Sequence, residues 1–237
     1  MNRREKHKAE TLTDIMRSAE ALFMEQGYEK TSMQQIASKA ELTKGALYHD
    51  FDSKEALFDR MCMEHNKALL DAVKPHIEDK TLSCLERMRR VIEITRGIGM
   101  SNISFVSEYL RNRHDDGNLI LKERLRRYDK LLYVTVMAPL LREAKEKGEC
   151  DFRASSEMLA LFILQLDRTV GDEINQVFIM ENGEAAEKHI QEIMETLVYT
   201  LSRILNRGPE IVSELIGMGE AMHFYKEVLR AQKNVQT

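Results

Sequence analysis

Residues 31–57 read TSMQQIASKAELTKGALYHDFDSKEAL, and this stretch decides the fold. Its apolar residues recur at steps of three and four, which is the spacing of one face of a helix. The pattern is first interrupted at residues 41–42, and this break is very short. Two short helices joined by so tight a turn predict a helix-turn-helix unit over about residues 32–51.

Short polar residues predict where these helices begin. Thr31 and Gln34 have the spacing of a capping box, so the first helix is expected to start near residue 31 or 32. Thr43 is placed to cap the second helix. Asp52 or Ser53 is placed to cap the helix that follows.

A longer helix precedes this unit. It is predicted by one apolar stripe, made of Leu12, Ile15, Met16, Ala19, Leu22 and Phe23. Gly27 follows the stripe and can take the left-handed conformation that ends a helix. Residues 1–10 are rich in charge and are either the start of this helix or a short basic arm that touches phosphate.

The rest of the chain predicts further helices and no strand, so the fold class is all-α. Pro75 is expected to end the helix that starts near residue 53, and Pro139 to kink another that Gly148 ends. Gly97 and Gly99 are expected to break a third helix. The run 158–166 is apolar on all sides and is expected to be buried on all sides. The predicted helices cover residues 53–73, 81–97, 102–111, 118–147, 155–179, 184–206 and 209–233.

Composition supports this fold class and limits the function. The 237 residues include 3 prolines and 11 glycines, with 6% aromatic and 31% charged residues, so turn formers are few. With a formal net charge of −4, the chain as a whole is not a polycation, although the charge of a local surface can differ from this total. The three cysteines are scattered, the first ten residues are charged, and no run of ~18 apolar residues occurs. We therefore expect a cytoplasmic protein with reduced thiols and no membrane span.

Motifs of catalysis are missing from the sequence. We find no glycine-rich phosphate loop, no GxSxG, no HExxH and no Cys/His spacing typical of a metal site. The densest polar triplet, residues 114–116, precedes Gly117 and is interpreted as a solvated loop. We expect neither an enzyme nor a bound cofactor or metal.

The N-terminal 60 residues resemble the DNA-binding domain of the TetR family, the tetracycline-repressor-type regulators. The resemblance rests on residues in a fixed order without a gap: Ile15, Ala19, Leu22, Phe23, Gly27, Tyr28, Thr31, Ser32, Ile36, Ala37, Ala40, Thr43, Lys44, Gly45, Leu47, Tyr48, Phe51, Ser53, Lys54, Glu55 and Leu57. It implies a DNA-binding domain over residues 1–60 and a helical domain for effector binding and dimerisation over residues 61–237. It also implies a sequence-specific transcriptional regulator, more often a repressor than an activator.

The resemblance also implies which residues contact DNA. Phosphates are expected to be held by Thr31, Ser32, Tyr48 and Lys54. Bases or the nearby backbone are expected to be met by Thr43, Lys44, Gly45, Ala46 and His49, where small residues permit close approach. Gln35 lies at the edge of this surface with Met33 and Gln34. A glutamine there either reads adenine or serves as a capping or solvated side chain.

Two residues depart from the family's pattern. Glu41 stands where the family usually has glycine, and a left-handed conformation costs other residues about 1–2 kcal/mol. We therefore expect a slightly different turn. Asp50 stands near the DNA backbone where His or Tyr is common, and its charge would repel phosphate. Residues 30–54 hold four lysines and three acidic residues, which predicts a shallow salt dependence of DNA binding.

The resemblance further implies a homodimer on a palindromic DNA operator, released by a small-molecule effector. One recognition helix buries too little surface for strong specificity, whereas two copies read two half-sites. Helices 155–179 and 184–206 are expected to form the dimer interface, or else only to build the core. Candidate effector contacts, each of which is otherwise an ordinary core or surface residue, are Met100, Phe105, Tyr109, Tyr128, Tyr133, Met137, Phe162, Asp167 and Arg168.

Two other functions remain open from the sequence. A thiol-based redox regulator would use Cys62 or Cys150 and would require an exposed thiol of low pKa. A helical interaction protein without DNA binding is the second. Neither the effector nor the operator sequence can be named from the residues.

Overall fold

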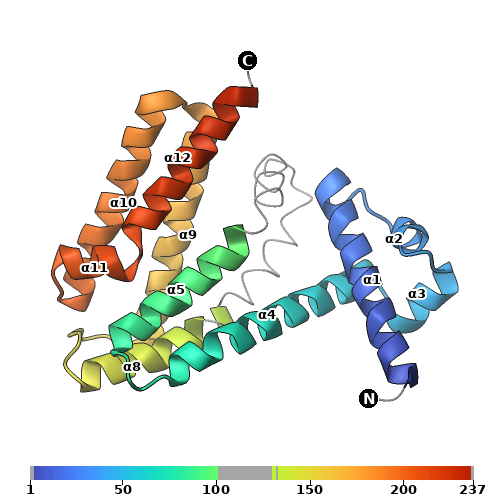
Figure 1. The fold of residues 1–237 in the computed structure, drawn as a ribbon, viewed down its shortest axis with the longest axis horizontal. Helices are drawn as coiled ribbons and strands as arrows, with labels where there is room; N and C mark the ends of the chain where they lie inside the picture. Colours follow the sequence, from blue (N-terminus) through green and yellow to red (C-terminus); the bar gives the residue numbers. More distant parts are fainter. Residues whose placement is uncertain (1–2, 101–129, 132, 236–237) are drawn as a thin grey trace. The chain divides into compact units, whose positions relative to one another are not determined.

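In the computed structural model, the described residues are 3–100, 130–131 and 133–235, and all their regular elements are helices (Figure 1). The predicted all-α fold is therefore confirmed. The chain divides into two compact units, of which one contains Met1–Ala68 and the other contains Leu69–Gly97 and Asp129–Thr237. The division lies inside helix α4 (Lys54–Glu78), beyond residue 60, where the sequence placed the boundary.

The first unit, which we call the head, contains α1 (Arg3–Gln26), α2 (Met33–Lys39), α3 (Lys44–Asp50) and the start of α4. α1 begins at Arg3, so residues 3–10 are the start of this helix. It ends at Gly27, whose φ of +85° is the predicted left-handed conformation. The four helices share one apolar core made of Ile15, Ala19, Leu22, Met33, Ile36, Ala37, Leu47, Phe51 and Leu57.

The capping box of α2 lies one residue later than predicted. Ser32 is the N-cap, because its hydroxyl accepts from the Gln35 N–H (3.3 Å) and Gln35 Oε1 accepts from the Ser32 N–H (2.8 Å). The predicted Thr31–Gln34 pair is therefore wrong. Thr31 is buried, and its hydroxyl donates to the carbonyl of Gly27 at 2.8 Å, which closes the turn after α1.

α4 continues through Pro75 to Glu78, so its predicted end near residue 73 is wrong. Proline lacks the N–H that would bind the carbonyl one turn earlier, at Asp71. Asp71 is exposed, so water can reach that carbonyl. In the last turn, Arg87 donates to the carbonyl of Ile77 at 3.0 Å, which satisfies an acceptor that the helix leaves open.

The second unit, which we call the body, contains the end of α4, α5 up to Gly97 and the described helices after residue 129. α10 packs against both α9 and α12, and α8 packs against α9. Figure 1 shows α9, α10 and α12 lying side by side. The elements are α5 (Cys84–Met100), η3 (Tyr133–Met137), α8 (Ala138–Glu146), α9 (Ser156–Met180), α10 (Gly183–Leu205), α11 (Pro209–Leu215) and α12 (Met218–Val235).

Two predicted ends of body helices are wrong. α5 runs through Gly97 and Gly99, since a glycine inside a helix costs only ~1 kcal/mol relative to alanine. The helix predicted over 209–233 is instead two helices, α11 and α12. Gly217 lies between them with a φ of +58°, and this left-handed residue turns the chain.

The region around Pro139 also differs from its prediction. Pro139 is the second residue of α8, and its missing N–H leaves a carbonyl of the preceding segment η3 without that donor. The chain enters α8 through the π-helical segment η3 instead of a kinked α-helix. Gly148, with a φ of +71°, follows α8 as predicted. The predicted helix 102–111 and residues 118–129 of the next one lie outside the described residues.

The apolar run 158–166 of α9 is not buried on every side, so that prediction is wrong for the single chain. Leu159, Ala160 and Leu164 are buried, but Met158 is 48% exposed and Phe162 is 55% exposed. α9 therefore buries one face against its neighbours and presents another at the surface. None of the described helices combines the length and apolar character needed to cross a membrane.

Candidate nucleic-acid interface

α3 is anchored by one side chain and exposes almost all its others. Leu47 is fully buried in the head core and fixes the rotation of the helix. Thr43 is the N-cap, and its hydroxyl accepts from the Ala46 N–H at 3.1 Å. The predicted contact residues on this helix are all exposed, namely Thr43, Lys44, Gly45, Ala46, Tyr48 and His49.

Gly45 and Ala46 leave the first turn of α3 unobstructed. A Cβ built on Gly45 would meet no other atom of the described residues within 4 Å, so packing within the head does not require glycine there. The space is open to an outside ligand, as close approach to a base edge demands.

Tyr48 is 42% exposed, so its ring lies at the surface of α3. Lys44, one turn earlier, places its ammonium 5.6 Å from the centre of the Tyr48 ring. The pair offers a cation and an exposed aromatic ring on one face of α3, where both can meet a sugar-phosphate backbone.

α2 contributes a polar edge whose glutamines differ in availability. Gln35 Oε1 accepts from both the N–H and the hydroxyl of Ser32, at 2.8 and 2.9 Å, so the capping alternative describes this side chain. Bidentate reading of adenine would require Gln35 to break that box. Gln34 is exposed beside it and was named only as a neighbour from the sequence. Its place in the first turn of α2 is the signal that could have added it.

The turn between α2 and α3 contains a left-handed residue that is not glycine. Glu41 has a φ of +56°, and the Leu42 N–H donates to the carbonyl of Ala37 at 2.9 Å. This bond is typical of a Schellman ending, and Leu42 packs against the head core. Glu41 and Asp50, the two residues that depart from the family's pattern, both lie at the surface. Asp50 Oδ1 is 3.3 Å from His49 Nδ1.

Two of the predicted phosphate contacts are engaged inside the head. Thr31 is only 2% exposed and bonds the backbone of Gly27. The ammonium of Lys54 donates to the carbonyls of Tyr28 and Thr31, at 2.7 and 2.9 Å. The structure therefore brings neither polar group to the surface that α3 exposes.

The candidate effector residues are only partly brought together. The Tyr133 hydroxyl donates a hydrogen bond to Asp167 Oδ2 at 3.5 Å, which joins η3 to α9. Met137 is the last residue of η3 and is buried. Phe162 is exposed, and Arg168 is half-buried. Phe105, Tyr109, Tyr128 and the side chain of Met100 lie outside the described residues.

Tyr225 of α12 was missed by the sequence reasoning. Burial raises the pKa of its hydroxyl, and the nearby Arg96 lowers that pKa while Asp167 raises it further. The ring packs against Phe178, with centroids 6.0 Å apart. No local motif marks this residue, because its neighbours come from α5 and α9.

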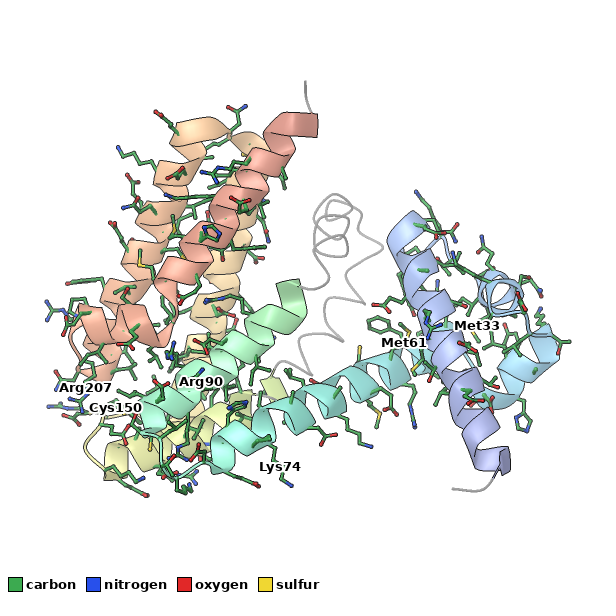
Figure 2. The ribbon with its side chains drawn as sticks, in the orientation of Figure 1. Met33, Met61, Lys74, Arg90, Cys150 and Arg207 are labelled. Atoms are coloured by element: carbon green, nitrogen blue, oxygen red, sulfur yellow. The ribbon has the colours of Figure 1, made fainter. Side chains whose placement is uncertain are left out.

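The cysteines are buried, which weakens the redox alternative. Burial raises the pKa of the Cys150 thiol to about 11, although Arg207 beside it acts in the opposite direction (Figure 2). Burial also raises the pKa of Cys84. A thiol with a raised pKa is poorly ionised at neutral pH and reacts slowly with oxidants.

Known proteins resemble the head alone and also longer stretches of the chain. The family model for bacterial regulatory proteins of the tetR family matches residues 15–61. The repressor DhaR of a Mycobacterium species is 24% identical over 193 residues, covering 79% of this chain and 92% of its own. The TetC protein of transposon Tn10 from Escherichia coli is 25% identical over 179 residues, which cover 62% of this chain and 90% of the TetC chain.

A solved structure shares the fold over most of the chain. The TetR-family regulator of Syntrophomonas wolfei superposes with a TM-score of 0.61 at 18% identity, over 83% of this chain and 96% of its own. Together, the exposed α3 and these likenesses define a DNA-binding transcriptional regulator. The family-model match over residues 15–61 and these relatives support a regulator of the tetR type.

Proposed function

We propose that this regulator is a cytoplasmic repressor that binds a palindromic operator as a homodimer and leaves it when a small molecule binds the body. The observation that carries the proposal is the exposed, unobstructed face of α3 on a helix anchored by Leu47. One such face contacts few base pairs, and two faces related by a twofold axis read two half-sites.

The contacts with DNA are assigned from exposure. We assign seven residues to direct contact, since each is exposed on α3 or at a helix cap: Ser32, Thr43, Lys44, Gly45 (through its backbone), Ala46, Tyr48 and His49. Gln35 acts by capping α2. The N–H groups at the start of α2 and α3 supply a partial positive charge that attracts phosphate without a cationic side chain.

The dimer interface is assigned to α9 and α10. These helices pack against each other and expose Met158, Phe162 and Tyr199, the last of them 60% exposed. Large apolar side chains at the surface of one chain are stabilised when a second copy covers them. A twofold arrangement of two helices from each copy gives a four-helix interface.

The effector site is assigned to the region between η3 and α9. Tyr133 and Asp167 meet there, and Tyr225 of α12 lies near Asp167. A ligand changes DNA affinity only when it binds one arrangement of the protein more tightly than the other. α4 is the element through which such a change would reach the head, because it begins in the head and ends in the body.

Selection of fragments from random duplex DNA by the full-length protein tests the regulator. We expect an enriched inverted repeat whose half-sites lie about one helical turn, or a multiple of it, apart. The Ala46→Glu variant should give no enrichment, because it places a carboxylate at the exposed N3 position of α3, where Thr43 and glutamate form a capping box that preserves the helix.

The Ala72→Glu variant is the matched control, since it adds the same charge at an exposed position of α4 outside the head. It should enrich the same repeat as the original protein. Failure of the original protein to enrich any sequence, or equal enrichment by Ala46→Glu, would refute the assignment of α3.

A further inference from the structure

Lys54 is the first residue of α4, and its ammonium lies in a cage formed by the head itself. Nζ donates to the carbonyl of Tyr28 at 2.7 Å, to that of Thr31 at 2.9 Å and more weakly to that of Glu29 at 3.4 Å. The same nitrogen lies 4.2 Å from the centre of the Tyr28 ring. Three acceptors and one aromatic face therefore surround this cation.

The position of Lys54 in α4 explains why its charge needs that cage. The first turn of a helix carries a partial positive charge, which disfavours a cation there. The segment after α1 presents carbonyl oxygens with the opposite partial charge, and these offset the repulsion. The Tyr28 ring adds attraction through its negative face and also packs against Phe58 of α4, with centroids 5.7 Å apart.

The caged segment leads directly into the DNA-facing surface. Residues 28–31 immediately precede Ser32, the N-cap of α2. The Thr31 hydroxyl donates a hydrogen bond to the carbonyl of Gly27. The segment contains no helix, and its backbone is held by the bond from the Thr31 N–H to the Tyr28 carbonyl (3.2 Å) together with side chains such as that of Lys54. The contacts of Lys54 join this backbone to α4, 26 and 23 residues further along the chain.

We propose that Lys54 is a positioning residue for DNA binding, which fixes segment 28–31 and so the N-terminus of α2, and that it does not itself neutralise a phosphate. The role rests on the proposed DNA contacts of the head. It assigns to Lys54 a function in the DNA-free protein, which a direct phosphate contact would not have.

Hydrogen exchange of the full-length protein without DNA tests this role separately from DNA binding. In Lys54→Met, the amides of residues 28–35 should exchange at least severalfold faster than in the original protein, because the local opening of that segment becomes easier. Lys30→Met is the matched control, because it removes an exposed lysine from the same segment, and it should leave the rates unchanged. Equal protection in all three proteins would overturn the proposal.

Salt titration of binding to the duplex recovered by selection provides the second readout. The number of phosphates that a protein neutralises sets the slope of affinity against salt, at about 0.9 per contact. Lys54→Gln removes the charge but keeps N–H donors, so its slope should equal that of the original protein and its affinity should exceed that of Lys54→Met. We expect Lys54→Met to bind about tenfold more weakly at every salt concentration.

Lys44→Met is the reference for a directly contacting lysine and should lower the slope by about 0.9 per half-site. A similar drop in Lys54→Gln would overturn the positioning role, and this readout holds even if Lys54→Met does not fold. If selection yields no duplex, the proposed DNA contacts fail, while the exchange measurement still decides what Lys54 does in the head.

Discussion

Glu41 has a φ of +56°, a conformation that places its Cβ against its own backbone. The surrounding contacts hold it there, since the bond from Leu42 to Ala37 and the packing of Leu42 fix the turn on both sides. The residue is exposed, so no contact of its side chain with the core repays this cost. The strain is local and is removed by removing the Cβ.

Replacing Glu41 by glycine should therefore stabilise the head. We expect Glu41→Gly to raise the free energy of unfolding by about 1 kcal/mol, measured by guanidinium-induced unfolding followed by circular dichroism. The control is Glu20→Gly, the same exchange at an exposed position inside α1, which should lower that free energy by about 1 kcal/mol. Equal effects of the two variants would show that the left-handed turn stores no strain.

At the scale of helices, two arginines of α5 hold the ends of other elements. Arg87 donates to the carbonyl of Ile77 in the last turn of α4, and Arg96 donates to the carbonyls of Ile216 and Gly217 after α11, at 2.6 and 3.1 Å. A helix end leaves its last carbonyls without helical partners. α5 therefore supplies donors to the ends of both helices.

Arg87 also belongs to a cluster of charges centred on Glu143 of α8. It is fully buried and lies 2.7 Å from Glu143 of α8, while Lys80 and Lys147 each lie 2.9 Å from the same carboxylate. Glu143→Gln should lower the free energy of unfolding by about 2–3 kcal/mol, because it leaves a buried guanidinium without its counter-charge. Glu78→Gln, which alters an exposed pair with Lys74, should change it by less than about 1 kcal/mol.

The same cluster predicts how stability responds to acid. Hydrogen bonds from Arg87, and then from Lys147 and Lys80, hold the pKa of Glu143 well below its usual range. A carboxyl whose pKa is lower in the folded protein stabilises it above the unfolded value, near 4.3, and loses this contribution as the pH falls below that value. The free energy of unfolding should thus fall between pH 5 and pH 3 by less in Glu143→Gln than in the original protein, in urea titrations at each pH.

At the scale of the molecule, the proposed dimer depends on apolar side chains that α9 and α10 expose. Phe162→Glu with Tyr199→Glu should convert the protein to a monomer of 27.5 kDa, because the charges would be buried at the interface. Light scattering at micromolar concentration gives the mass. Met63→Glu is the matched control, since Met63 on α4 has the same 55% exposure as Phe162. A monomeric original protein, or a dimeric double variant, would contradict the assignment.

The head was the part that its sequence predicted best. Its helices are short and follow one another, so the apolar spacing and the left-handed Gly27 were enough to place α1, α2 and α3. The anchoring of α3 by Leu47 follows from the same spacing. Its DNA-facing residues could be named because exposure on a helix follows from which positions the core already occupies.

The sequence by itself thus determined the helical class, the order of the helices in the head and the face that α3 exposes. Only the tertiary structure decided that Lys54 and Thr31 are engaged inside the head, that α4 passes Pro75, and that α9 leaves Phe162 at its surface. The physical reason is distance along the chain. Helical spacing is a property of neighbouring residues, whereas the contacts that use up a polar group join residues up to 121 positions apart, as Arg96 and Gly217 show.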